Sequence, residues 1–204
     1  MVGARSLLYL LFFLSILSIT VAILKYRQYR RDNTLGREFP SLLVGWLEKD
    51  DVASALRHVE GADGANAAVL REGLRNFHEG PVVMEKIMAS RVVREKNRLE
   101  AYLIVLGTIG NNAPFIGLLG TVMGIIKAFH DLAMTTVQGP QTVMAGISEA
   151  LIATAVGLFV AIPTVVLFNW LQGQSQLLLD EVDSNAKIVL AYAERQTEGR
   201  HGRE

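Results

Sequence analysis

Apolar residues along this chain are gathered into three long runs, each long enough to cross a lipid bilayer. The first run extends from Leu7 to Leu24, the second from about Ala101 to Phe129, and the third from about Val143 to Leu171. A transmembrane helix needs about 20 mostly apolar residues, because each residue adds about 1.5 Å along the helix axis. The pattern predicts an all-α membrane protein with three transmembrane helices.

Basic residues gather on one side of these runs. The first run is followed by Lys25, Arg27, Arg30 and Arg31, and the second is preceded by Lys86, Arg91, Arg94, Lys96 and Arg98. Because loops rich in Lys and Arg stay in the cytoplasm, this distribution predicts an external N-terminus and a cytoplasmic C-terminus. The alternative for the first run is a cleaved signal peptide, but the charge lies on the wrong side and no small-residue cleavage site follows.

The polar segments divide the chain into four parts. We expect an N-terminal transmembrane helix with its basic flank over residues 1–31 and a helical cytoplasmic insertion over 32–100. A hairpin of the second and third spans occupies 101–172, and a cytoplasmic helix and tail occupy 173–204, with the last eight residues expected to fray. Both hairpin helices are predicted to extend into the cytoplasm, because no helix-breaking signal separates them from their polar neighbours.

The insertion itself carries helix signals. Its first helix presents an apolar stripe of Leu42, Leu43, Trp46 and Leu47. Asp50 or Asp51 caps a helix that runs through Val59 and ends at Gly61, and residues 65–77 form another. Pro81 takes the favoured first position of a helix that is expected to run without interruption into the second span.

Small residues recur at intervals of three and four along the second and third runs, so they share one face of each helix. The two faces comprise Gly107, Gly110, Pro114, Gly117, Thr121, Gly124 and Ala128, and Gly146, Ala150, Ala153, Gly157, Ala161 and Thr164. Small faces let helices approach closely in lipid. Packing within one chain accounts for part of each face, and the surplus predicts self-association. Pro114 and Pro163 are expected to bend their helices.

Glu149 is the only charged residue between Leu132 and Leu179. An ionisable group within a membrane span costs roughly 2.5–3.5 kcal/mol on insertion scales and usually faces a cavity or a partner, which favours ion conduction. The alternatives are a structural salt bridge to Lys127 and a buried neutral acid. Lys127 lies near the external end of the second run, where its side chain can reach the interface.

Two threonines are expected at a similar depth in the membrane. Thr121 and Thr154 lie on either side of the short connection between the second and third runs, and their depths should agree within about 5 Å. Two hydroxyls at one depth can form a polar ring in an oligomer. The alternative is that each hydroxyl bonds to a carbonyl of its own helix.

Composition removes most other classes of protein. The 204 residues carry a formal net charge of zero, which gives no global field to attract nucleic acid. No cysteine is present, so disulfide scaffolds and thiolate metal sites are excluded, and the four histidines lack metal-ligand spacing. No nucleotide-binding loop or nucleophile motif occurs, so we expect neither an enzyme nor a resident cofactor or metal.

Two stretches of sequence carry a family resemblance. NAPFIGLLGTVMGIIKAF, over residues 112–129, and AGISEALIATAVGLFVAIPTVVLFNW, over residues 145–170, resemble the MotA/TolQ/ExbB proton-channel family. The three-span layout is similar to that of TolQ and ExbB rather than to four-span MotA. The resemblance implies a multi-pass protein of the bacterial inner membrane in which residues 101–172 form the channel, as a pentamer around two copies of a single-span TolR/ExbD-like partner.

The resemblance also implies a mechanism. The partner's membrane aspartate would carry H⁺, while Thr121, Thr154 and Glu149 of this chain would line the proton pathway. Proton flow would then drive mechanical work across the cell envelope, with a TonB/TolA-like or gliding-machinery component as a further partner. Lys127 departs from the family pattern and is a candidate modulator. A membrane scaffold that conducts nothing is the alternative of a different class.

Overall fold

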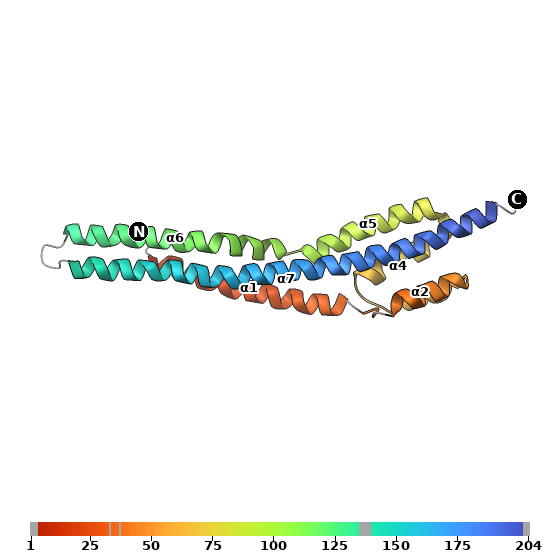
Figure 1. Ribbon diagram of the computed structural model, residues 1–204, viewed down its shortest axis with the longest axis horizontal. Helices are drawn as coiled ribbons and strands as arrows, with labels where there is room; N and C mark the ends of the chain where they lie inside the picture. The colour runs from red at the N-terminus through yellow and green to blue at the C-terminus, as the bar shows by residue number, and fades with distance from the viewer. Residues whose placement is uncertain (1–3, 33, 37, 135–139, 202–204) are drawn as a thin grey trace. The chain divides into compact units, whose positions relative to one another are not determined.

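The structure is a computed structural model that describes residues 4–32, 34–36, 38–134 and 140–201. Within these residues it consists of helices and short connections, without a strand (Figure 1). The elements are α1 (Ala4–Asp32), α2 (Phe39–Glu48), α3 (Val52–Glu60), α4 (Ala65–Arg75), the 3-10 helix η1 (Phe77–Glu79), α5 (Pro81–Glu100), α6 (Leu103–Met134) and α7 (Pro140–His201). The all-α prediction is confirmed.

Three of these helices are long and apolar enough to cross a membrane. The candidate spans are Ser6–Asp32 in α1, Leu103–Ala133 in α6 and Val143–Gly199 in α7, and each contains a strongly apolar stretch of 18 residues. They coincide with the three runs in the sequence. α7 continues as one helix through His201, so the third span does extend into the polar C-terminal segment, and the helix includes part of the tail that was expected to fray.

The chain forms two compact units. The first contains Met1–Leu24 and Tyr102–Leu171, which are the apolar segments, and the second contains Lys25–Ala101 and Gln172–Glu204, which are the polar ones.

In the first unit, α1 packs on both hairpin helices. Leu11 is fully buried in a cluster with Ile109 and Ala113 of α6 and with Val160 and Ala161 of α7. The outer faces carry large exposed apolar side chains, among them Tyr9, Phe12, Phe13, Phe115, Phe159 and Ile162. An apolar surface of this kind is unfavourable in water and suits contact with lipid or with another membrane helix.

In the second unit, the short helices form as their capping and stripe residues predict. Asp51 caps α3 by accepting a hydrogen bond from the Ser54 amide at 3.0 Å, and Gly61 follows the end of that helix. α2 buries Phe39, Leu43 and Leu47, whereas Leu42 of the apolar stripe is 47% exposed.

The prediction of a continuous helix from Pro81 into the second span is wrong. α5 ends at Glu100, Ala101 takes an extended conformation with ψ 137°, and Tyr102 takes a positive φ of 66° before α6 begins at Leu103. A left-handed backbone is unfavourable for a residue with a side chain, so local sequence preference does not cause this break. The carbonyl groups at the end of α5 instead receive hydrogen bonds from α1, as detailed below.

Candidate functional site

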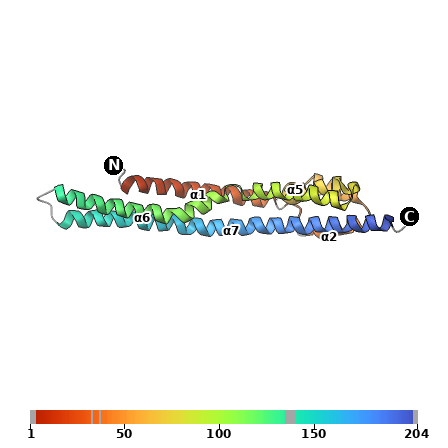
Figure 2. The same cartoon turned by 90° about the horizontal axis from the view of Figure 1, so that it is seen from above.

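The α6–α7 hairpin holds every residue that the sequence singles out for ion passage. The two helices run antiparallel and lie side by side in both views (Figures 1 and 2). The pairing of residues is that of antiparallel helices. Gly107 near the start of α6 lies beside Phe168 of α7, and Ala128 near the end of α6 lies beside Gly146.

Main-chain atoms approach most closely at the centre of this contact. A methyl group at Gly117 would lie 2.8 Å from the carbonyl oxygen of Ala153 and 3.0 Å from the Cα atom of Thr154. A methyl group at Gly157 would lie 2.7 Å from the carbonyl oxygen of Ala113. These distances are shorter than van der Waals contact, so only glycine allows the two backbones to meet here.

The contact continues towards both ends of the helices. Gly124 faces Ala150, and Gly110 faces Val165, each with the nearest side-chain carbon 2.6 Å from the position of an added methyl group. Gly120, which the sequence analysis did not include, packs against Ala153 in the same way. Its spacing of three from Gly117 and four from Gly124 would have placed it on the same face.

The two small faces therefore face each other within one chain. The packing of α6 on α7 uses residues of both faces, as expected for part of each, and self-association stays a prediction. Pro114 and Pro163 lie inside α6 and α7, which continue as helices past them.

Thr121 and Thr154 meet across this contact. The Thr154 hydroxyl donates to Oγ1 of Thr121 at 3.5 Å, and the Thr121 hydroxyl donates to the Leu118 carbonyl at 2.6 Å. Thr121 is 8% exposed and Thr154 is half-buried. The two hydroxyls are level, as the sequence predicts, and Thr121 also makes the bond to its own helix that was the alternative. The result is a short hydroxyl chain between two apolar helices.

Glu149 and Lys127 lie at the edges of the same contact. Glu149 is exposed and directly precedes Ala150, which is fully buried against Gly124. Lys127 is exposed and directly precedes Ala128, which is buried against Gly146. Glu149 and Lys127 are therefore exposed, while the residue that follows each of them packs between α6 and α7.

No group of three or more His, Cys, Asp or Glu side chains that could hold a metal ion occurs among the residues that the structure describes. The candidate site residues of the hairpin supply the hydroxyls of Thr121 and Thr154, the carboxylate of Glu149 and the ammonium group of Lys127. Hydroxyls can pass or orient a proton, but a relay across a membrane needs a further acid or base.

Comparison with known proteins identifies the type of hairpin. The model of the MotA/TolQ/ExbB proton channel family matches residues 62–184, which is more than half of the chain and includes all of the Thr121–Thr154 contact. The chain belongs to this family. Its membership and its three apolar helices point to a membrane protein of the bacterial inner membrane.

Individual relatives agree with the family model. The Tol-Pal system protein TolQ of Pseudomonas aeruginosa is 38% identical over 128 residues, which cover 57% of this chain and 55% of the relative. The biopolymer transport protein ExbB of Xanthomonas campestris is 34% identical over 136 residues, which cover 67% of this chain and 52% of the relative. The ExbB protein of Neisseria gonorrhoeae is 35% identical over 130 residues, which cover 64% of this chain and 54% of the relative. The chain spans about half the length of the curated relatives that it matches.

Proposed function

We propose that this chain is the channel subunit of a proton-driven motor, in which a TolR/ExbD-like single-span partner supplies the proton-carrying aspartate. The observation that carries the proposal is the hydroxyl pair of Thr121 and Thr154, which lies where α6 and α7 meet closely in a chain from a proton-channel family.

The arrangement supports a shared pathway rather than one made by this chain alone. Thr121 is nearly buried and donates its hydrogen bond to a carbonyl of its own helix, so the pair presents Thr154 as its more accessible member. One carboxylate, Glu149, is available in the apolar part of α7. An acid on a neighbouring helix of another protein would complete the set of proton carriers.

Five copies of this chain around two copies of the partner are the assembly that the family resemblance implies. In this assembly the exposed apolar faces of α1, α6 and α7 would contact lipid, the partner or other copies. The N-terminus would lie in the periplasm and the C-terminus in the cytoplasm, and H⁺ would be the transported ion. The names of the relatives suggest envelope machines of the Tol-Pal or biopolymer-transport type, and the driven component would be TonB/TolA-like or part of a gliding apparatus.

Proton uptake into liposomes tests the proposal. The protein would be reconstituted alone and with the candidate partner, and a pH-sensitive dye in the lumen would report uptake under a pH gradient and membrane potential. We expect flux only with the partner, and loss of that flux in Thr154→Val and Glu149→Ala while the complex stays intact.

Thr108→Val is the matched control, because Thr108 is an exposed threonine of α6 whose hydroxyl donates to the Ile104 carbonyl of its own helix at 2.7 Å. It should conduct like the wild type. Absence of flux from an intact complex of the wild-type proteins would favour the scaffold function. Normal flux in Thr154→Val would reject the pathway through the hydroxyl pair.

A further inference from the structure

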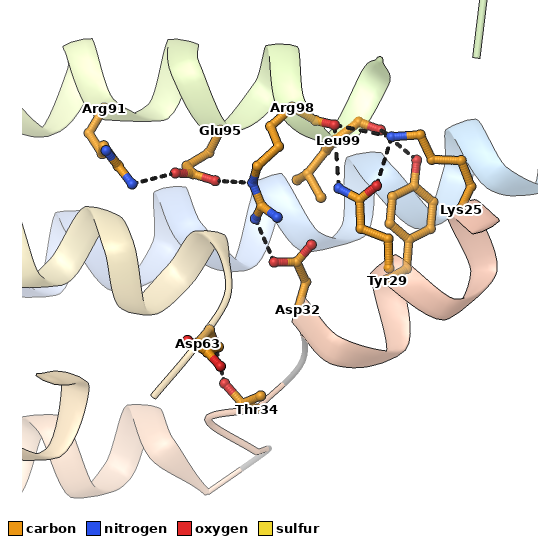
Figure 3. A network of polar contacts seen from close by, with 10 residues as sticks. Lys25, Tyr29, Asp32, Thr34, Asp63, Arg91, Glu95, Arg98 and Leu99 are labelled. Atoms are coloured by element: carbon orange, nitrogen blue, oxygen red, sulfur yellow. Dashed lines mark hydrogen bonds and ion pairs between the residues drawn. The ribbon is translucent and has the colours of Figure 1, made fainter. Parts of the chain in front are cut away.

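The end of α5 is bound by side chains of α1, and both belong to the second unit (Figure 3). Nζ of Lys25 donates to the carbonyl oxygens of Arg98 at 3.1 Å and Leu99 at 2.9 Å. The Tyr29 hydroxyl donates to the same Leu99 carbonyl at 2.8 Å, and Nε2 of Gln28 donates to that of Arg98 at 3.4 Å. We call Lys25, Gln28 and Tyr29 the α1 clamp.

The two carbonyls have lost their helical partners. In an uninterrupted helix they would accept hydrogen bonds from the amides of residues 102 and 103, four positions later. The break at Ala101 and Tyr102 prevents this, and a buried carbonyl without a donor is costly. The α1 clamp supplies the missing donors, and the positive charge of Lys25 suits the negative end of the α5 dipole.

The clamp is inside the protein rather than on its surface. Lys25 is 3% exposed, Tyr29 is 6% exposed and Leu99 is fully buried. The ammonium group also contacts Oε1 of Gln28 at 3.0 Å and lies 5.7 Å from the centre of the Tyr29 ring. A buried ammonium group is retained only where its hydrogen bonds are satisfied, and here backbone carbonyls satisfy them.

A row of ion pairs also holds the end of α5, and one of them again reaches α1. The Arg98 guanidinium contacts Asp32 of α1 at 2.5 Å and Glu95 at 2.6 Å, and Arg91 contacts Glu95 at 2.8 Å. Burial by itself lowers the pKa of Arg98, but the hydrogen bonds to Asp32 and Glu95 outweigh that effect and raise it. Arg98 is therefore held both through its carbonyl and through its side chain.

We propose that Lys25 and Tyr29 are positioning residues that fix the break between α5 and α6, and that motor output depends on this break although proton passage does not. The second part rests on the proposed function. The α1 clamp connects α1 with the last residues of α5, which directly precede the break and α6. Force acting on α1 could therefore reach this break through the clamp. It contains none of the residues assigned to the proton pathway.

Solid-state NMR of the full chain in lipid tests the first part without any assumption about function. The ¹³C shifts of Ala101 and Tyr102 report whether these residues are helical. In the double variant Lys25→Met/Tyr29→Phe we expect these shifts to change. The Ala101 amide, which donates to the Asn97 carbonyl at 3.0 Å, should exchange its hydrogen about tenfold faster, in line with the loss of a hydrogen bond to a charged group.

The control is Arg27→Met/Tyr26→Phe, which likewise removes one cationic group and one phenol hydroxyl, but from exposed side chains of the same helix. The control should leave the ¹³C shifts and the Ala101 exchange rate unchanged. Lys25→Arg keeps a cationic donor, so its shifts and exchange rate should lie between those of the wild type and the double variant. Tyr29→Phe alone provides a milder variant if the double variant does not fold. Unchanged shifts at Ala101 and Tyr102 in a folded clamp variant would overturn the proposal.

Flux and output, measured on the same variants, test the second part. The expected result is normal partner-dependent proton uptake, together with the cellular phenotype that deletion of the gene causes. Normal flux with a normal phenotype, or loss of flux itself, would overturn the coupling role. If the wild-type complex conducts nothing, the proposed function fails, and the NMR result still decides whether the clamp fixes the break.

Discussion

Gly117 offers the sharpest test of how the hairpin is held together. In Gly117→Ala, the added methyl group would meet the Ala153 carbonyl oxygen at 2.8 Å, the Thr154 Cα atom at 3.0 Å and the Gly157 Cα atom at 3.2 Å. All three are main-chain atoms, so no side chain can rotate away. Relief requires α6 and α7 to separate by a few tenths of an ångström over the length of their contact.

The cost follows from two opposing effects. Overpacking a close contact costs about 1–3 kcal/mol, and the upper part of this range applies where the backbone must move. Replacing a helical glycine with alanine returns about 1 kcal/mol through helix propensity. The net expectation for Gly117→Ala is a destabilisation of about 2 kcal/mol.

Gly173→Ala is the matched control. Gly173 also lies inside a long helix, α7, but nothing lies within 4 Å of the position of its added methyl group. Only the propensity term remains, so this variant should be more stable than the wild type by about 1 kcal/mol.

Thermal unfolding in detergent, followed by the fluorescence of Trp46 and Trp170, would give the order of the midpoints. The expected order is Gly173→Ala, wild type, Gly117→Ala, and then Gly117→Val. A midpoint for Gly117→Ala at or above that of Gly173→Ala would refute the close backbone contact.

Two further predictions concern the second unit. Hydrogen bonds from Ser54 lower the pKa of Asp51 below its ordinary value of 3.8, so the stability this cap contributes is complete above pH 3.8 and lost as the pH falls through the folded-state pKa. Asp51→Asn keeps a capping side chain but removes the titrating group. The midpoint temperature of thermal unfolding should therefore fall below that of this variant in the wild type only at acidic pH. Parallel pH profiles of the two midpoints would contradict the assignment. Arg98→Met should destabilise the protein by about 2 kcal/mol or more, because it removes the cation paired with the buried Asp32 carboxylate, which is 3% exposed, and leaves Glu95, 6% exposed, with Arg91 alone. The guanidinium is itself 44% exposed, which moderates the loss. Arg75→Met, which removes only the exposed pair with Glu60, should cost about 1 kcal/mol or less, and equal losses in urea unfolding would disprove the distinction.

The sequence predicts those parts of the fold whose cause is local. The three apolar runs identify α1, α6 and α7, and Asp51 and Gly61 mark the limits of α3. The spacing of Gly117, Thr121 and Gly124 correctly places them on one face. What that face packs against depends on the path of the chain, and the structure shows that it packs against the other helix of the same hairpin. Self-association of the hairpin stays a prediction.

The break before α6 could not be predicted for the same reason. Ala101 and Tyr102 carry no glycine or proline signal, and the donors that stabilise the end of α5 come from Lys25 and Tyr29, more than 70 positions earlier for Lys25. The basic residues after the first run were interpreted only as a topology signal. One of them, Lys25, is buried, and its burial results from the contact of α1 with the end of α5.

The matched glycines and alanines of the hairpin also limit how this chain can change in length. One residue inserted into α6 between Gly107 and Gly124 would turn everything on one side of it by about 100°, because a helix has 3.6 residues per turn. The small residues beyond the insertion would then point away from α7, and bulky neighbours such as Leu118 or Val122 would take their place. Insertions and deletions among homologous sequences should therefore be rare within the paired stretches of α6 and α7 and concentrated in the connection between them.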